Sequence, residues 1–343
     1  MKALRFHSFG GPDRVCWEDV PEPQIRPNHV RVAVKAGALN RLDIWVREEL
    51  PGIPVALPMI QGSDISGEVI ELGQGVTQLS LGDRVAILPI FGCGHCSFCD
   101  RGDIHICPQH GFYGETCEGN FSEQVVRPAK NFYKIPDNLN YLEGAAITLV
   151  SVTSWEMLVV KAKLQKKETL LVLGASSGIG TMAIQIGKLK GAKVIAITSG
   201  EDNCQKAKAL GADHVIDRLT HPAFAKKVKS LNGNKGVDVI FEHTGAATFA
   251  QSQRCLGYAG RMVICGATTG PELKIDARFL FVKQWQILGS SMGRADLLPE
   301  IFSHFASGKL KAVIGKEMPM SEGAEAQRLL VNGNVFGKIV LTT

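Results

Sequence analysis

The chain has 343 residues, of which 45% are hydrophobic and 21% charged, and its formal net charge is +5. This length exceeds what one hydrophobic core usually serves, so we expect two domains in an ordinary globular protein. The charge is not gathered in basic runs interleaved with aromatic residues, which argues against a nucleic-acid partner. No apolar run approaches the length of a membrane span and no signal peptide is evident, so we expect no membrane contact and a cytoplasmic location.

The first 150 residues contain short β-type runs broken by proline and glycine, such as HVRVAVKAGAL and GDRVAILPI. They predict a β-rich domain. From about residue 168 the pattern changes to six short apolar strands that alternate with helices, including helices over 178–190 and 201–210. Apolar residues at helical spacing in the first of these, from Ile179 to Leu189, predict one face packed on a sheet.

This alternation predicts an α/β domain with a doubly wound parallel sheet over residues 151–290. After residue 290 we expect a helix over 296–307 and a last strand, GKIVLTT, that returns to the first domain. The first domain would then comprise residues 1–150 and 291–343.

Four thiols, Cys93, Cys96, Cys99 and Cys107, lie within fifteen residues at the spacing C-x2-C-x2-C-x7-C. Thiolate sulfur suits zinc, and four such ligands close its coordination sphere. We therefore predict one structural Zn²⁺ per chain in a lobe at about residues 92–110. Disulfides are disfavoured because the cysteines total nine and the other five are scattered singly, while an iron–sulfur cluster remains an alternative.

The segment Leu170–Gly180 reads as a buried strand, a turn of small residues and the start of a helix. Backbone N–H groups in such a turn can approach a pyrophosphate, and the helix N-terminus adds partial positive charge. We predict that Ser176, Ser177, Gly178 and Ile179 bind a dinucleotide.

The next strand ends in Thr198, Ser199 and Gly200. An acidic residue at this point would bind the ribose 2′-hydroxyl of NAD(H), and its replacement by small and hydroxyl residues leaves room for a 2′-phosphate. We favour NADP(H) over NAD(H), although Glu201 and Asp202 follow at once and Lys206 is the nearest base.

These features together resemble the medium-chain dehydrogenase/reductase superfamily, on motifs that span the chain: PEPQIRPNHVRVAVKAGALN, GDRV, the cysteine lobe, KALGADHVID and FGKIVL. The resemblance implies a GroES-like catalytic domain, a Rossmann cofactor domain, an active site in the cleft between them, and a homodimer or homotetramer acting on a small-molecule substrate. It also implies cofactor contacts at Thr153, Thr244, Gly245, Gly266, Ala267 and Thr268.

Zinc-type alcohol dehydrogenases of this superfamily hold a second, catalytic zinc through a cysteine, a histidine and a cysteine. The matching positions here are Asn40, Ser63 and Leu149, which cannot form a zinc site of the usual kind. An unusual metal site that uses Asp43, Asp64 or a histidine remains an alternative.

Asparagine at the first position resembles the quinone oxidoreductase and enone reductase branch. Reduction of such conjugated carbonyls needs less charge stabilisation than oxidation of an alcohol, so a neutral hydrogen-bond donor can suffice. We predict Asn40 and Ser63 as donors to the carbonyl oxygen, with Asp43, Asp64 and Tyr113 as further candidates that orient groups or supply a proton.

Short-chain dehydrogenases are excluded, because no tyrosine is followed four residues later by lysine. The prediction is an NADP(H)-dependent reductase of quinones or enones. The alternatives are an alcohol dehydrogenase, and a nucleotide-binding structural or regulatory protein with negligible turnover.

Overall fold

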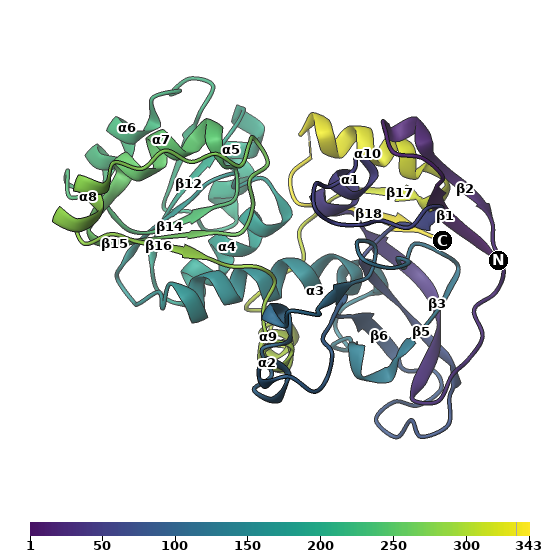
Figure 1. Ribbon diagram of the computed structural model, residues 1–343. Helices are drawn as coiled ribbons and strands as arrows, with labels where there is room; N and C mark the ends of the chain where they lie inside the picture. The colour runs from purple at the N-terminus through teal and green to yellow at the C-terminus, as the bar shows by residue number, and fades with distance from the viewer. Residues whose placement is uncertain (334) are drawn as a thin grey trace. The chain divides into compact units, whose positions relative to one another are not determined.

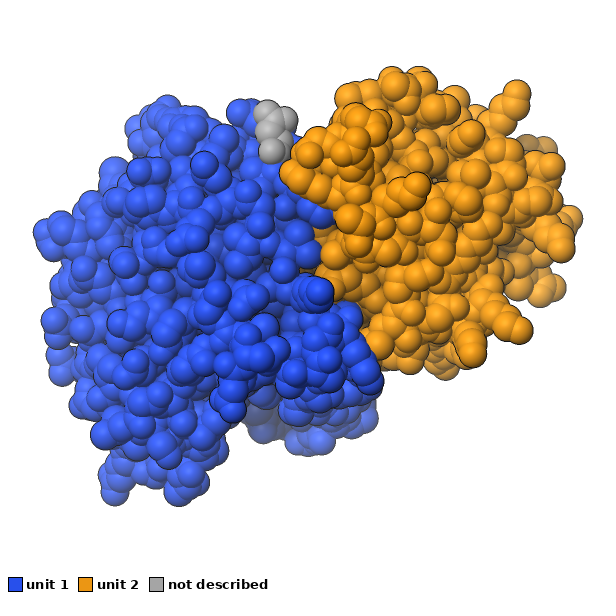
Figure 2. Space-filling view, turned by 180° about the vertical axis from the view of Figure 1, so that it is seen from behind, with its two compact units in different colours: residues 1–149, 294–343 blue, residues 150–293 orange. Residues whose placement is uncertain are grey.

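The computed structural model describes residues 1–333 and 335–343. The chain divides into two compact units, which Figure 2 colours separately. Unit 1 comprises Met1–Leu149 and Arg294–Thr343, and unit 2 comprises Val150–Gly293.

Unit 1 is rich in β-structure (Figure 1). Its main sheet has the strand order β10-β6-β5-β3-β18-β17, and β9 also pairs with β3. A second sheet has the order β2-β1-β4, and β7 pairs with β8. The bounds are β1 (Lys2–Phe6), β2 (Val15–Asp19), β3 (His29–Ala38), β4 (Met59–Ile60), β5 (Asp64–Leu72), β6 (Arg84–Ile87), β7 (Ile90–Phe91), β8 (Gly111–Phe112), β9 (Gln124–Pro128), β10 (Phe132–Lys134), β17 (Ile314–Pro319) and β18 (Lys338–Thr342).

The core of unit 1 follows from alternation along these strands. In β3, Val30, Val32 and Val34 are buried and pack with Ile65 and Val85 of neighbouring strands, while the residues between them face outward. The helices of the unit are α1 (Arg41–Arg47), α2 (Ser97–Asp100), α9 (Leu298–Ala306) and α10 (Gly323–Asn332).

The C-terminal strand β18 pairs antiparallel with β3, with Val340 opposite Ala38 and Leu341 opposite Gly37. The last strand therefore lies in the main sheet of unit 1. This pairing carries the end of the chain next to the residues that follow β3.

Unit 2 contains a parallel sheet with the strand order β13-β12-β11-β14-β15-β16, which confirms the predicted doubly wound fold. Its strands are β11 (Thr169–Val172), β12 (Lys193–Thr198), β13 (His214–Asp217), β14 (Val237–Glu242), β15 (Leu256–Ile264) and β16 (Gln286–Gly289). Its helices are α4 (Gly178–Leu189), α5 (Glu201–Ala209), α6 (Phe224–Leu231), α7 (Ala246–Cys255) and α8 (Ala277–Val282).

Helices cover both faces of this sheet (Figure 1). Leu171 and Ile195 point to the face on which Phe224 of α6 and Phe249 of α7 pack. Their neighbours Leu170 and Val194 point to the opposite face, where a Cβ on Gly187 of α4 would lie 2.8 Å from each. The central strands β11 and β12 are therefore covered on both sides, which explains why they read as continuous apolar runs.

One helical segment, Tyr141–Lys161, is long and apolar enough to cross a membrane by length and composition. The expectation that no segment reaches that length was therefore wrong. The segment consists of α3 (Tyr141–Trp155) and a π-helical turn (Glu156–Lys161). Because 78% of its most apolar window is buried, it has the character of a core helix.

Candidate functional site

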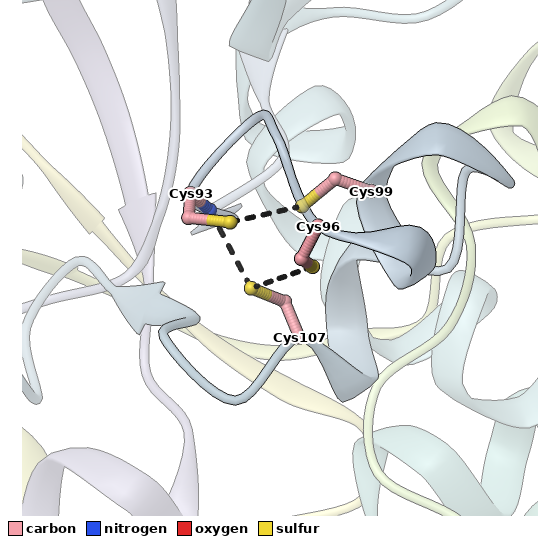
Figure 3. Close-up of side chains that lie close together, drawn as sticks. All are labelled: Cys93, Cys96, Cys99 and Cys107. Atoms are coloured by element: carbon pink, nitrogen blue, oxygen red, sulfur yellow. Dashed lines mark hydrogen bonds between the residues drawn. The ribbon is translucent and has the colours of Figure 1, made fainter.

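The four predicted zinc ligands lie together in unit 1. Their sulfur atoms all lie within 4.8 Å of one another. Figure 3 shows the four side chains pointing toward a common centre. The distance from Cys93 Sγ to Cys99 Sγ is 3.9 Å, and that from Cys96 Sγ to Cys107 Sγ is 3.7 Å. Zinc–sulfur bonds of about 2.3 Å at tetrahedral angles place sulfurs about 3.8 Å apart, so the donor set fits Zn²⁺. All nine cysteines are described, and each is free of disulfide bonds.

Backbone groups complete the surroundings of these sulfurs. Cys93 N and Gln109 N donate to Cys107 Sγ, and Gly94 N donates to Cys99 Sγ. A Cβ on Gly92 would lie 2.7 Å from Cys99 Sγ, so glycine is required for this approach. N–H donors of this kind favour thiolates and so support a metal-bound state.

A second cluster forms where β3, β5 and β18 run side by side. Asn40 follows β3 and precedes α1. Ser63 immediately precedes β5, Asp64 begins that strand, and Lys338 begins β18. In the sheet, Ala38 of β3 pairs with both Asp64 and Val340. Adjacent strands therefore bring together residues that are about 300 positions apart.

The side chains of this cluster are joined by hydrogen bonds. Lys338 Nζ donates to Asn40 Oδ1 at 2.6 Å and lies 3.4 Å from Asp64 Oδ2. Asn40 Nδ2 donates to Asp64 Oδ2 at 2.9 Å and lies 3.2 Å from Ser63 Oγ and 3.3 Å from Ala38 O. Asp64 Oδ1 accepts a bond from Leu149 N. The amide of Asn40 thus has a fixed orientation. One of its N–H groups bonds to Asp64, and the other has only longer contacts, with Ser63 Oγ and Ala38 O.

Most of this cluster is buried. Ser63 and Asp64 are 0% exposed and Lys338 is 5% exposed, whereas Asn40 is partly exposed. Burial raises the pKa of Asp64 and lowers the pKa of Lys338, and the attraction between the two charges opposes both shifts. Lys338 and Asp64 thus form a salt bridge removed from water, and both side chains bond to the amide of Asn40.

Asp43 lies beside this cluster in the first turn of α1. Its carboxylate accepts the backbone N–H of Asn40 at 2.7 Å, an arrangement that caps the helix. Burial raises its pKa to about 7, although this bond and the charge of Lys338 favour the ionised form. Asp43 therefore has both a structural role and an acidity suited to proton transfer near neutral pH.

This cluster does not fit a catalytic zinc. The positions at which the family resemblance implies zinc ligands hold Asn40, Ser63 and Leu149. Among the described residues, the only group of three or more cysteine, histidine or acidic residues placed to bind a metal is the cysteine cluster. An ammonium ion between Asn40 and Asp64 would also repel a dication.

Tyr113, another candidate, lies in the hydrophobic core of unit 1. Its ring contacts Phe91 at 5.0 Å, and the Arg127 guanidinium lies 4.6 Å from its centroid. Burial raises its pKa to about 12, which makes the phenol a weaker acid. These surroundings favour a packing role over proton donation.

In unit 2, the predicted dinucleotide turn lies between β11 and α4. Ser177 caps α4, with its Oγ accepting the N–H of Gly180 at 3.0 Å, and Gly174 has a φ of +55°. Other candidates lie at the carboxyl ends of neighbouring strands. Thr244 N donates to Glu242 Oε1, Gly245 precedes α7, and Gly266, Ala267 and Thr268 follow β15. Thr153 belongs to α3 and its hydroxyl contacts the sulfur of Met292.

At the end of β12, Thr198 is buried, and Gly200 has a φ of +82°. Sheet pairing brings Arg218 beside this point, because Arg218 N donates to Thr198 O at 2.9 Å. Lys206, the base nearest in sequence, is paired with Asp202 at 2.6 Å. Arg218 is thus a basic residue that lies beside the end of β12, although it is far from Thr198 in the sequence.

Sequence reasoning missed Lys338 and Arg218 as candidate site residues. Lys338 stands in the sequence at the start of a terminal strand, and Arg218 comes well after Gly200, beyond the next helix and strand. The strand order of each sheet, which no local pattern carries, decides both positions.

Known proteins match the whole chain. A family model described as zinc-binding dehydrogenase matches residues 178–307, and one described as alcohol dehydrogenase GroES-like domain matches residues 26–137. An NAD-dependent alcohol dehydrogenase of Sulfurisphaera tokodaii is 31% identical over 99% of both chains. A quinone oxidoreductase of Homo sapiens is 26% identical over 99% of this chain and 97% of its own.

The chain belongs to the medium-chain dehydrogenase/reductase superfamily. A solved structure described as an NAD-dependent alcohol dehydrogenase matches it with a TM-score of 0.96 and 40% identity, covering 100% of both chains. The predicted family, the fold with its GroES-like and Rossmann domains, and the assignment as an NAD(P)-dependent oxidoreductase are confirmed. The cysteine cluster fits the structural zinc expected of this family.

Proposed function

We propose that this protein is an NADP(H)-dependent oxidoreductase that reduces an activated carbonyl acceptor, a quinone or an α,β-unsaturated carbonyl, without a catalytic zinc. The observation that carries the proposal is the hydrogen bond from Lys338 Nζ to Asn40 Oδ1, in a cluster whose donor set does not fit a metal. Such a cluster offers hydrogen-bond donors and a buried positive charge, which suit an acceptor whose developing charge is already spread by conjugation.

The cofactor supplies the hydride. Asn40, the partly exposed member of the cluster, donates a hydrogen bond to the acceptor oxygen through the amide N–H that has only long contacts within the cluster. Lys338 draws electron density from the amide oxygen and so strengthens the opposite N–H as a donor. In the absence of substrate, this N–H of Asn40 donates to Ser63 Oγ. The acceptor oxygen then takes the place of the serine hydroxyl. Asp43, with a pKa of about 7, is the proposed source of the proton that the reduced product takes up.

The cofactor preference for NADP(H) rests on the end of β12. Arg218 is exposed there and forms no ion pair within the described residues, so its guanidinium is available to a 2′-phosphate. The proposed contacts of the dinucleotide are Thr153, Ser176, Ser177, Gly178, Ile179, Thr198, Ser199, Gly200, Thr244, Gly245, Gly266, Ala267 and Thr268. We also propose one structural Zn²⁺ per chain on the four cysteines.

An alcohol dehydrogenase is the second candidate. It is favoured by the names of relatives, since both the 31% identical relative and the 40% identical structure are described as NAD-dependent alcohol dehydrogenases. Without a metal, however, the cluster must stabilise an alkoxide by hydrogen bonds alone. A protein that binds the nucleotide with negligible turnover is the third candidate.

Kinetic assays of quinones, enones, aldehydes and alcohols with all four nicotinamide cofactors, together with metal analysis, separate these candidates. We expect reduction of conjugated carbonyls with NADPH and one zinc per chain. Oxidation of simple alcohols by NAD⁺ with two zinc ions per chain would overturn the proposal. Tight cofactor binding without turnover of any substrate would favour the third candidate.

A homodimer or homotetramer is proposed on the surface of unit 2 formed by α8 and β16. Phe279, Phe281 and Val282 of α8 are 48%, 68% and 59% exposed, and β16 is an edge strand. Light scattering coupled to gel filtration should give at least twice the chain mass of 37.0 kDa. A cytoplasmic location is proposed from the nine unpaired cysteines, which suit a reducing compartment.

A further inference from the structure

His243 occupies a position where three loops of unit 2 meet. It follows β14, and its ring stands at 69° to that of Phe241 with 6.0 Å between centroids. Its Nε2 lies 3.0 Å from Leu173 O, at the end of β11, and 3.4 Å from Ser177 Oγ. Because a carbonyl oxygen only accepts, the 3.0 Å contact requires hydrogen on Nε2.

The ring also fills the space beside Gly174. A Cβ at this glycine would lie 2.7 Å from both Cε1 and Nε2 of His243, and the φ of +55° places Gly174 in the left-handed region. The turn after β11 therefore has no side chain of its own at this point. The imidazole of His243 takes that place and is held by a hydrogen bond.

The backbone of His243 reaches a third loop. Its carbonyl oxygen accepts a bond from Thr268 Oγ1 at 3.2 Å, in the loop that follows β15. Glu242, immediately before it, accepts bonds from Thr244 N at 2.7 Å and Ser252 Oγ at 2.7 Å, which fixes the start of α7. The loops after β11, β14 and β15 are thus joined through one residue.

We propose that His243 is a positioning residue for the dinucleotide: its Nε2–H holds the turn Gly174–Ser177 in the shape that presents the N-terminus of α4 to the cofactor phosphates. The inference rests on dinucleotide binding by this superfamily, and it is independent of which acceptor the enzyme reduces. A free turn would have to be ordered when the cofactor binds, and that cost would reduce the affinity.

Two amide substitutions give a matched test. Glutamine can place its Nε2–H close to the position of the histidine Nε2, whereas asparagine is too short to reach Leu173 O. We expect H243N to raise the Kd for NADPH and NADH about fivefold to tenfold, the loss typical of one hydrogen bond. We expect H243Q to recover most of the affinity, and both variants to keep kcat within about twofold of the parent, as for a group that binds but does not react.

A double-mutant cycle with Gly174 tests the contact itself. The G174A variant should lose stability for two reasons: the positive φ of this position and the clash of the new Cβ with the His243 ring. When His243 is replaced by alanine, the same substitution should cost less stability, because only the strain of the positive φ remains. Chemical denaturation without cofactor measures this coupling. Equal cofactor affinity of H243N and the parent, or no coupling between positions 174 and 243, would overturn the proposal. If the parent binds neither cofactor, the failure lies in the proposed function instead.

Discussion

The ammonium of Lys338 lies 2.6 Å from the amide oxygen of Asn40, although the two residues are 298 positions apart in the chain. The bond exists because β18 pairs with the end of β3. It places a buried positive charge in the cluster that contains Asn40, Ser63 and Asp64. The chemistry proposed for this enzyme depends on that charge.

Replacing Lys338 by methionine should lower kcat for a quinone or enone about tenfold, because the amide of Asn40 loses its polarising partner. The KM for the cofactor should stay nearly unchanged. The variant should also lose about 3–5 kcal/mol of stability, since Asp64 would remain buried without its counter-ion.

The double variant D64N/K338M separates these effects. It should recover most of the lost stability, as measured by urea denaturation, because no charge remains unpaired. Its kcat should stay low in steady-state assays. Recovery of kcat together with stability would show that Lys338 only supports the fold.

The N40A variant should lower kcat for the carbonyl acceptor by about 100-fold, the usual scale for loss of a donor to a developing oxyanion. The S63A variant should cost much less, since Ser63 only accepts the hydrogen of Asn40 in the resting cluster. Stability should be measured in parallel, because Asn40 precedes α1. A larger loss for S63A than for N40A would assign the donor role to Ser63.

Asp43 should make stability depend on pH. Its pKa is raised from 3.8 to about 7 in the folded protein. Between these values the folded state holds a proton that the unfolded state has released, so this group's contribution to stability falls as pH rises from about 4 to 7. The D43N variant lacks this titration and keeps an oxygen to cap α1.

We therefore expect D43N and the parent to have similar stability at pH 4. At pH 8 the variant should be more stable by about 2–4 kcal/mol, at 1.36 kcal/mol per unit of pKa shift. Urea denaturation at several pH values measures the difference. A difference that does not change with pH would show that Asp43 titrates normally.

Arg218 should decide the cofactor preference. The R218Q variant should raise the KM for NADPH about tenfold and leave the KM for NADH unchanged, since only the former carries a 2′-phosphate. The matched control is K206Q, which should have little effect because Lys206 is already paired with Asp202. Equal loss with both cofactors would place Arg218 outside the 2′-phosphate site.

Removing a zinc ligand should unfold the cysteine lobe and leave unit 2 intact. The C99S variant should lose its zinc and become sensitive to protease within residues 92–110, whereas C16S, at an exposed cysteine, should keep both properties. Cofactor affinity should change less than about twofold, because the parallel sheet of unit 2 is built without the lobe. Loss of turnover with an intact lobe would assign this zinc a chemical role.

Local patterns in the sequence were sufficient for much of this protein. The strand and helix alternation after residue 168 predicts the parallel sheet, because strands covered on both faces must be continuously apolar. The cysteine spacing predicts the metal cluster, since its ligands are close in the chain and its geometry is set by zinc chemistry. The sequence also shows asparagine, serine and leucine at Asn40, Ser63 and Leu149, from which we predict that a catalytic zinc site is lacking.

The tertiary structure decided which residues lie beside Asn40 and Asp64 and which residue contacts the turn after β11. Lys338, Arg218 and His243 all reach their partners across neighbouring strands, and strand order depends on burial of whole sheet faces. The acidity of Asp43 likewise depends on its removal from water and not on its neighbours in sequence. Charge, contact and pKa in this enzyme are set by the packing of distant segments, which a linear pattern does not contain.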